Sequence, residues 1–317
     1  MHWTTKAKIQ NIVSLFPSSV SYATYYWIQR HLGGLKRVNP VSRLKFGVET
    51  WRQIKALDRS PSDKVFLEVG TGRVPTVPIA YWLMGAKSTV TLDLNPYMKE
   101  ELVRESIQYI SEHRDEIEGL FGSLLDESRL DDLLNFYKND NLSMDSFLDF
   151  CKIKYIAPGD AAKTGLEENS IDFHTSCNVL EHIPPAILRE IIQEGNRIVA
   201  DDGLFVHRID YSDHFSHSDD SISAINFLQF SDSEWDRYAG NRYMYMNRLR
   251  HDDFSAIFES AGQRILSKKP TVDERSLELL NSGTFRLNER YKEKSDDVLS
   301  IIDSWIVSQK VSAREVQ

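Results

Sequence analysis

Short apolar runs, each bounded by turn residues, alternate along the chain with stretches in which apolar residues recur at helical spacing. The runs predict strands at residues 64–68, 88–94, 153–157, 171–177, 204–209, 264–267 and 301–308. The helical stretches lie at 10–57, with breaks at prolines and glycines, and at 76–84, 185–199 and 251–261. Strand, helix and strand follow one another within about thirty residues of the first run, which is typical of a βαβ unit and predicts a parallel sheet.

Two segments do not fit this alternation. Residues 99–150 are long, polar and helix-forming, whereas a plain connection between two strands would be short. We interpret them as a helical insertion that could act as a lid. We therefore expect two parts, which are a basic helical cap at 1–60 and a domain at 61–317 that carries the insertion.

Charge is distributed unevenly along the 317 residues. The formal net charge is −9, but residues 1–60 carry ten Lys and Arg against two acidic residues, which leaves −17 for the remainder. An acidic body argues against nucleic acid as a partner. The basic, tyrosine-rich head could close over a substrate, contact an anionic membrane surface, or consist of solvated helices only. We favour closure, with peripheral membrane contact second.

The sequence has no apolar run long enough to span a membrane and no secretory signal at its start. Its two cysteines, Cys151 and Cys177, lack the spacing of metal ligands, which suits a reducing compartment. We therefore expect a cytoplasmic protein.

The stretch LEVGTGRVP follows the first predicted strand and carries the first candidate chemistry. Gly70 and Gly72 permit a sharp turn and a close ligand approach, but Pro75 stands where a pyrophosphate-binding loop would have its third glycine. Glu68 adds negative charge, which suits a ligand with a cationic part. Asp93 ends the second strand, where a carboxylate can accept both hydroxyls of a ribose. Together these features indicate a nucleoside with a cationic tail and no phosphate.

Five segments occur in order at the predicted strands: FLEVGTGRV, TLDLNP, PGDAAKTGLEENSIDF, TSCNVLEHI and RHDDFSAIFESAGQRIL. They resemble, in turn, the first motif, the ribose-binding acid, the adenine segment, the fourth-strand motif and the late helix with sixth strand of class I S-adenosylmethionine-dependent methyltransferases. The likeness covers about 64–210 and 250–309, and Val74 departs from it because many members have a glycine there. It implies an α/β, Rossmann-like, seven-stranded and mostly parallel sheet with helices on both faces, and S-adenosylmethionine as cofactor.

The resemblance implies eight cofactor-binding residues. They are Glu68, Gly70, Gly72, Asp93, Leu94, Asp160, Ala161 and Asn178. The two glycines and the acid before them would line or support the methionine portion, and Asn178 would lie near its end. Asp93 would hold the ribose. Leu94, Asp160 and Ala161 would contact the adenine.

A second group of polar residues follows the fifth predicted strand. The segment 207–220 contains four acidic residues and three histidines, which are Asp210, Asp213, Asp219, Asp220, His207, His214 and His217. It could supply a base, bind a divalent cation, or be a polar loop without chemistry. We favour the base and assign no metal ligand, with His214 and Asp210 as candidates. His182, just after the fourth strand, is a third candidate catalytic residue.

The sequence thus predicts an enzyme that transfers a methyl group from S-adenosylmethionine to a small molecule or a glycan precursor. An oxygen acceptor is favoured because the histidines and acids could accept its proton. Two alternatives stay open, which are an NAD-dependent oxidoreductase on a related sheet and a non-catalytic module that binds S-adenosylmethionine. The sequence predicts neither the acceptor's identity nor the oligomeric state.

Overall fold

The computed structural model describes residues 1–138 and 143–311. Two short segments lie outside the described residues. Residues 139–142 belong to the expected insertion, and residues 312–317 end the expected methyltransferase domain.

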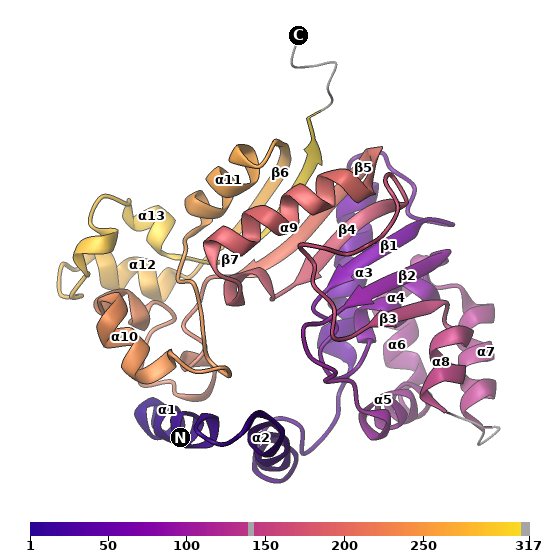
Figure 1. The fold of residues 1–317 in the computed structure, drawn as a ribbon, viewed down its shortest axis with the longest axis horizontal. Coiled ribbons are helices and arrows are strands. Elements are labelled where there is room, and N and C mark those ends of the chain that lie inside the picture. The colour runs from indigo at the N-terminus through magenta and orange to yellow at the C-terminus, as the bar shows by residue number, and fades with distance from the viewer. Residues whose placement is uncertain (139–142, 312–317) are drawn as a thin grey trace.

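A single seven-stranded sheet forms the centre of the protein (Figure 1). Its strands are β1 (Val65–Val69), β2 (Ser88–Leu92), β3 (Ile153–Ile156), β4 (Ile171–Cys177), β5 (Val199–Asp210), β6 (Gln263–Val272) and β7 (Ile301–Lys310). Their order is β3-β2-β1-β4-β5-β7-β6, and only β7 runs antiparallel to its two neighbours. The predicted fold class is confirmed. The strand order reverses between β1 and β4, so ligands are expected beyond the carboxyl ends of these strands.

Side chains of β1 alternate between two apolar layers, as a strand buried on both faces requires. Phe66 packs in one cluster with residues of α3 (Val41–Lys55) and α4 (Thr76–Leu83), whereas Leu67 packs in another with Ile191 and Ile198 of α9 (Pro185–Ile198). Both residues are fully buried. Helices therefore cover both faces of the sheet, as predicted.

The described helices comprise α1 (Trp3–Ser14), α2 (Ser18–Leu32), α3 (Val41–Lys55), α4 (Thr76–Leu83), α5 (Glu100–Glu112), α6 (Arg114–Phe121), α7 (Glu127–Lys138), α8 (Met144–Phe150), α9 (Pro185–Ile198), α10 (Asp232–Ala239), α11 (His251–Ser260), α12 (Glu274–Asn281) and α13 (Asp296–Leu299). Short 3₁₀ turns lie at Gly122–Leu124, Leu180–His182, Ser216–Ser218, Asn226–Gln229 and Glu289–Tyr291. Among the described helices, none has both the length and the apolar character needed to cross a bilayer.

The helical insertion between β2 and β3 consists of α5 to α8 and packs on the main body. Val103, Ile107 and Phe147 belong to the same apolar cluster as α3 and α4. In the N-terminal part, α3 contributes Leu44 and Trp51 to this cluster as well. The division near residue 60 into a cap and a domain stays a prediction.

Two strands are longer than predicted. The fifth was expected at 204–209 and spans Val199–Asp210, and the sixth was expected at 264–267 and spans Gln263–Val272. The additions include the charged residues Asp201, Asp202, Lys268 and Lys269, so the apolar pattern did not indicate them. The sixth strand extends because β7 is long enough to pair with Gln263–Val272 along its whole length.

Candidate functional site

The loop after β1 turns back beneath the end of β2. Gly70 and Gly72 have positive φ angles of 88° and 69°, a region that favours glycine. A Cβ atom on Gly70 would lie 2.4 Å from Cγ2 of Val179, so the loop also approaches the segment after β4 closely. The Gly70 N–H donates to the carbonyl of Leu92 at 2.8 Å. The loop is therefore fixed between the ends of β2 and β4.

Asp93 joins three segments at this edge of the sheet. Its carboxylate accepts from the Gly72 N–H at 2.9 Å and from the Asn95 N–H at 3.1 Å. Its carbonyl accepts from the Gly159 N–H at 2.9 Å, which places the segment after β3 beside it. A carboxylate has about four acceptor positions, so two backbone bonds leave room for ribose hydroxyls. Burial raises the pKa of Asp93, and the bonds from Asn95 and Gly72 oppose that shift.

The three residues expected at the adenine differ in exposure. Leu94 is 69% exposed, whereas Ala161 is buried in the cluster that contains Leu92. Asp160 is exposed, and its carboxylate caps the Ala162 N–H at 2.8 Å. All three follow the adjacent strands β2 and β3. The structure thus brings them to one edge, where an exposed leucine can be covered by a flat apolar ring.

The environment of Glu68 differs from the one expected for a charged carboxylate at the ligand site. It is buried, and it accepts a hydrogen bond at 2.8 Å from Thr91, whose hydroxyl lies 2.5 Å from that of Thr71. Burial raises the pKa of Glu68 to about 8, although the Thr91 bond and the positive charge of Arg43 act in the opposite direction. The sequence suggested a fixed negative charge, whereas burial in the structure favours the neutral form of this carboxyl.

A cavity of about 540 Å³ lies against this loop. Its lining includes Glu68, Gly72 and Arg73 of the loop, Arg43 of α3 and Tyr97 of the segment after β2. With Arg37, three arginines line the cavity and give it positive charge that could meet the carboxylate of an amino-acid moiety. None of the three was among the predicted site residues. Arg73 stands inside the glycine motif itself, while nothing in the sequence connects Arg43 to the loop.

Asn178 follows β4 and adopts a positive φ of 56°. Its N–H donates to the carbonyl of Arg208 at 2.9 Å, and its side-chain oxygen accepts from the Arg208 guanidinium at 2.5 Å. Arg208 also forms an ion pair with Asp303 at 3.0 Å. Asn178 is therefore held between β4, β5 and β7, close to the glycine loop through its neighbour Val179.

The candidate catalytic residues from two segments meet beyond β4 and β5. Asp210 lies 3.5 Å from Nε2 of His214 and 3.8 Å from Nε2 of His217, and it accepts from the Ser212 hydroxyl at 2.5 Å. Burial alone would raise the pKa of Asp210, but His214 and Ser212 outweigh it and lower the pKa to about 2. The rings of His182 and His214 have their centroids 4.9 Å apart. The structure thus brings all three candidate catalytic residues together.

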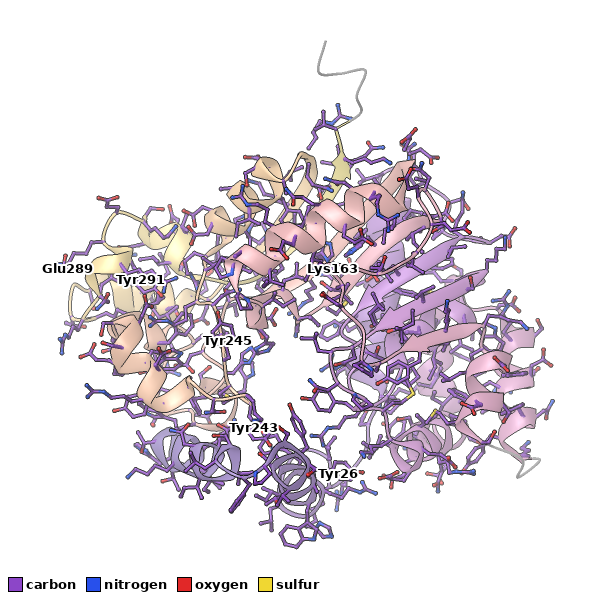
Figure 2. All side chains as sticks on the ribbon, viewed as in Figure 1. Tyr26, Lys163, Tyr243, Tyr245, Glu289 and Tyr291 are labelled. Atoms are coloured by element: carbon purple, nitrogen blue, oxygen red, sulfur yellow. The ribbon has the colours of Figure 1, made fainter. Side chains whose placement is uncertain are left out.

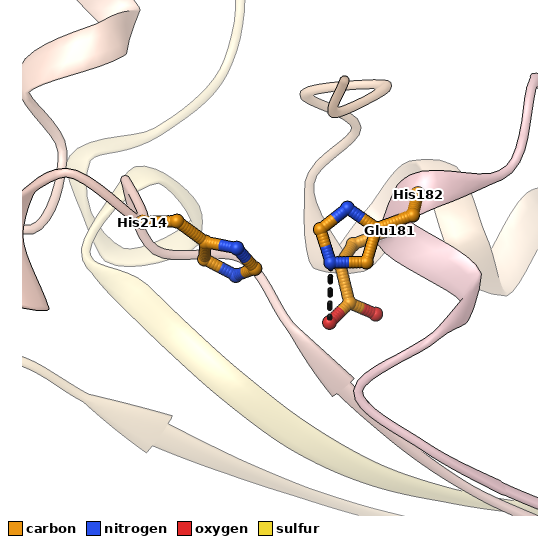
Figure 3. A group of neighbouring side chains, drawn as sticks. All are labelled: Glu181, His182 and His214. Carbon is orange, nitrogen blue, oxygen red and sulfur yellow. Dashed lines mark ion pairs between the residues drawn. The ribbon is translucent and has the colours of Figure 1, made fainter. Parts of the chain in front are cut away.

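A residue that the sequence analysis did not single out, Glu181, completes this group (Figure 3). His182 donates from Nδ1 to the carbonyl of Tyr245 at 2.8 Å, because a carbonyl can only accept. Its Nε2 therefore keeps a lone pair and lies 4.0 Å from Oε1 of Glu181. Glu181 is 1% exposed, and neither of its carboxyl oxygens has a hydrogen-bond partner among the described residues. Burial raises the pKa of Glu181 well above its usual value and lowers that of His182 to about 4. In the sequence, the signal that could have indicated Glu181 was its position directly before His182 in TSCNVLEHI.

The same group meets the donor requirements of a divalent transition metal. One ligand atom each from Glu181, His182 and His214 lie within 4.8 Å of one another. Two imidazoles and a carboxylate are common ligands of such ions. Only His214 comes from the segment 207–220. His207 lies inside β5 and bonds to Ser176 at 2.7 Å. Among the described residues, the segment therefore supplies only one of the three ligand atoms of this candidate metal group.

Comparisons with known proteins returned structural likenesses only. No protein-family model matches the sequence, and no curated protein matches it. A provisionally assigned methyltransferase from Bacillus halodurans aligns with 84% of this chain and 99% of its own, at 14% identity and a TM-score of 0.45. A provisionally assigned S-adenosylmethionine-dependent methyltransferase from Listeria monocytogenes aligns with 83% and 98%, at 12% identity and a TM-score of 0.42.

A third solved structure is phosphoethanolamine N-methyltransferase 2 from Haemonchus contortus in complex with S-adenosyl-L-methionine. It aligns with 83% of this chain and 52% of its own, at 13% identity and a TM-score of 0.45. Structural likenesses at such low identity and TM-score carry no conclusion about the activity of this protein. The fold of the chain rests on its own strand order.

Proposed function

We propose that the protein transfers a methyl group from S-adenosylmethionine to a small-molecule or glycan-precursor acceptor. The observation that carries this proposal is the arrangement around Asp93, whose carboxylate binds the glycine loop at the switch point of the sheet. A ribose carboxylate beside a loop with two positive-φ glycines fits a nucleoside ligand. The adjoining cavity is also lined by Arg37 and Arg43, whose guanidinium groups could meet the carboxylate of an amino-acid moiety. Glu68, Gly70, Gly72, Asp93, Leu94, Asp160, Ala161 and Asn178 would hold the donor.

We further propose that the acceptor atom is an oxygen. Its lone pair would attack the donor methyl carbon, the bond from that carbon to sulfur would break, and S-adenosylhomocysteine would leave with the sulfur electron pair. His214 would take the acceptor's proton. Nε2 of His214 lies 3.5 Å from the Asp210 carboxylate, whose negative charge would stabilise the protonated ring, and Nδ1 would accept the proton. His182 borders the same group through its ring contact with His214.

Calorimetric titration of the full chain with S-adenosylhomocysteine and, separately, with NAD tests the donor. We expect the first to bind and the second to bind far more weakly. Preference for NAD would instead support the oxidoreductase alternative. A screen of hydroxylated acceptors by mass spectrometry then tests turnover, and donor binding without any methylated product would support the non-catalytic module.

The variant His214→Ala tests the base. General-base catalysis contributes roughly 10²–10⁴-fold, so kcat should fall by about this factor while the Kd for S-adenosylhomocysteine stays unchanged. His113→Ala is the matched control, because His113 lies between α5 and α6 and stacks on Tyr109. A kcat that falls equally in both variants, or in neither, would remove the proposed role of His214.

Peripheral contact with an anionic membrane is a second proposal, supported by exposed apolar residues on α1, on α2 and directly after α1. Leu15 and Leu32 are 83% and 77% exposed, and Ile12 and Trp27 are also exposed. Exposed apolar side chains near basic residues favour an anionic bilayer surface. Cosedimentation with phosphatidylglycerol vesicles should be lost at high salt and weakened in Leu15→Ser. Ile187→Ser, an exposed position on α9, is the control.

A further inference from the structure

A second cavity, of about 480 Å³, lies between α2 and the segment that follows β2. Aromatic and basic side chains dominate its lining, and Figure 2 labels Tyr26, which extends from α2 at this place. The basic members are Arg30, Arg73 and Lys99. None of the twelve lining residues, all of them in the described part of the chain, is acidic, although the whole chain carries a net charge of −9.

The positive charges converge on one ring. The guanidinium carbon of Arg73 lies 4.9 Å from the centroid of Tyr26, and the ammonium of Lys99 lies 5.3 Å from it. The Lys99 N–H donates to the carbonyl of Arg73 at 3.0 Å, so the backbone fixes the two residues side by side. Their cationic groups are therefore held near each other by the fold.

These two cations differ from Arg30, the third basic residue of the cavity, in forming no ion pair in the described part of the chain, although Lys99 is near enough to Glu101 to lower the pKa of that carboxyl. Arg30 forms an ion pair with Glu105, and Glu101 accepts from the Tyr26 hydroxyl at 2.7 Å. Within the described residues, the side chains of Arg73 and Lys99 make neither an ion pair nor a hydrogen bond, and Nη1 of Arg73 is buried without a partner. Buried polar groups are nearly always paired, so the unpaired guanidinium points to a ligand.

We infer that this cavity binds the phosphate ester of the acceptor. Two unpaired cations balance the charge of about −1.5 to −2 that a phosphate monoester carries near pH 7. A guanidinium binds phosphate with two parallel N–H donors, and an ammonium adds a compact charge. The aromatic walls, Tyr22, Trp27 and Tyr97, would cover the organic part of the ligand.

The location of the cavity connects this binding to methyl transfer, and the inference rests on the proposed function. Arg73 and Tyr97 line both this cavity and the one against the glycine loop. An acceptor anchored here by its phosphate would therefore lie next to the donor. The competing interpretation is that Arg73 binds the carboxylate of the donor itself.

The test is calorimetric titration of the full chain with inorganic phosphate and with pyrophosphate, at constant ionic strength, with and without saturating S-adenosylhomocysteine. We expect phosphate to bind in both conditions. In Lys99→Gln the binding should be about tenfold or more weaker, which is the loss expected for one charge-assisted hydrogen bond. Lys8→Gln is the matched control, because Lys8 is exposed on α1 and outside the cavity.

Displacement of phosphate by S-adenosylhomocysteine would assign Arg73 to the donor and overturn the inference. Equal phosphate binding by Lys99→Gln and Lys8→Gln, or no phosphate binding by the unaltered protein, would also overturn it. Failure of S-adenosylhomocysteine to bind, with phosphate binding intact, would refute the proposed donor and leave the anion site standing. A thermal melt of Lys99→Gln confirms that the variant is folded.

Discussion

The contact between Gly70 and Val179 yields the sharpest prediction on the stability of the donor loop. In Gly70→Ala the new methyl group would lie 2.4 Å from Cγ2 and 2.9 Å from Cγ1 of Val179. The φ angle of 88° adds backbone strain for any residue with a Cβ atom. Left-handed backbone costs about 1–2 kcal/mol and overpacking about 1–3 kcal/mol, so the free energy of unfolding should fall by roughly 2–5 kcal/mol.

Gly72→Ala is the matched control for this substitution. Gly72 also has a positive φ, of 69°, but a Cβ atom there would meet no atom within 4 Å. Only the backbone strain applies, so Gly72→Ala should lose about 1–2 kcal/mol. Urea denaturation measures both variants, provided that each unfolds in one transition.

A double-mutant cycle separates the clash from the backbone strain. Adding Val179→Ala to Gly70→Ala removes the Cγ atoms that the new methyl group would meet. We expect a favourable coupling of about 1–3 kcal/mol between the two substitutions, which equals the overpacking contribution. If Gly70→Ala were no less stable than Gly72→Ala, or if the cycle showed no coupling, the close approach of the two segments would be refuted.

Two further predictions concern the carboxyl groups at the donor loop. Burial raises the pKa of Glu68 from its usual 4.5 to about 8, so its stabilising contribution is fully present below about pH 4.5 and is lost as the pH rises through about 8. Urea denaturation from pH 5 to pH 9 should therefore show a larger loss of stability in the unaltered protein than in Glu68→Gln, and parallel curves would contradict the buried carboxyl. Asp93→Asn removes the charged acceptor that would hold the ribose and should weaken S-adenosylhomocysteine binding by about tenfold or more, measured by calorimetry; an unchanged Kd would show that the ribose lies elsewhere.

The strand positions could be predicted because each strand of the sheet is bounded by turn residues and is apolar where it is covered. Predicting the positions of β1 and β4 requires only that local information. The lengths of β5 and β6 do not follow from it, since β5 includes the acidic residues Asp201 and Asp202, and the polar residues Lys268 and Lys269 extend β6 because they pair with β7. Pairing across the sheet depends on residues that are distant in the chain, and no local pattern encodes it.

In the candidate site, too, some features follow from local sequence and others depend on the assembled fold. The juxtaposition of Gly70, Gly72 and Asp93 could be predicted because loops after parallel strands meet at one edge, and their role in binding stays a prediction. The protonation of Glu68 could not, because it depends on how completely neighbouring segments exclude water. Glu181 was missed since a carboxyl next to a histidine is common at surfaces, and only burial without a partner distinguishes it here. Burial is a property of the assembled fold.

Arg73 lines both cavities, so ligand binding in one cavity can affect ligand binding in the other. In the sequence it is an ordinary residue between Gly72 and Val74, and it acquires a role only because α2 lies over the loop and places Tyr26 against its guanidinium. Aromatic contacts hold α2 there, with Tyr22 5.4 Å from Tyr97 and Tyr25 4.0 Å from Tyr243 between ring centroids. A ligand in either cavity that orders Arg73 would change the affinity of the other cavity for its own ligand. Such coupling is reciprocal. If phosphate raises the affinity for S-adenosylhomocysteine by some factor, S-adenosylhomocysteine must raise the affinity for phosphate by the same factor.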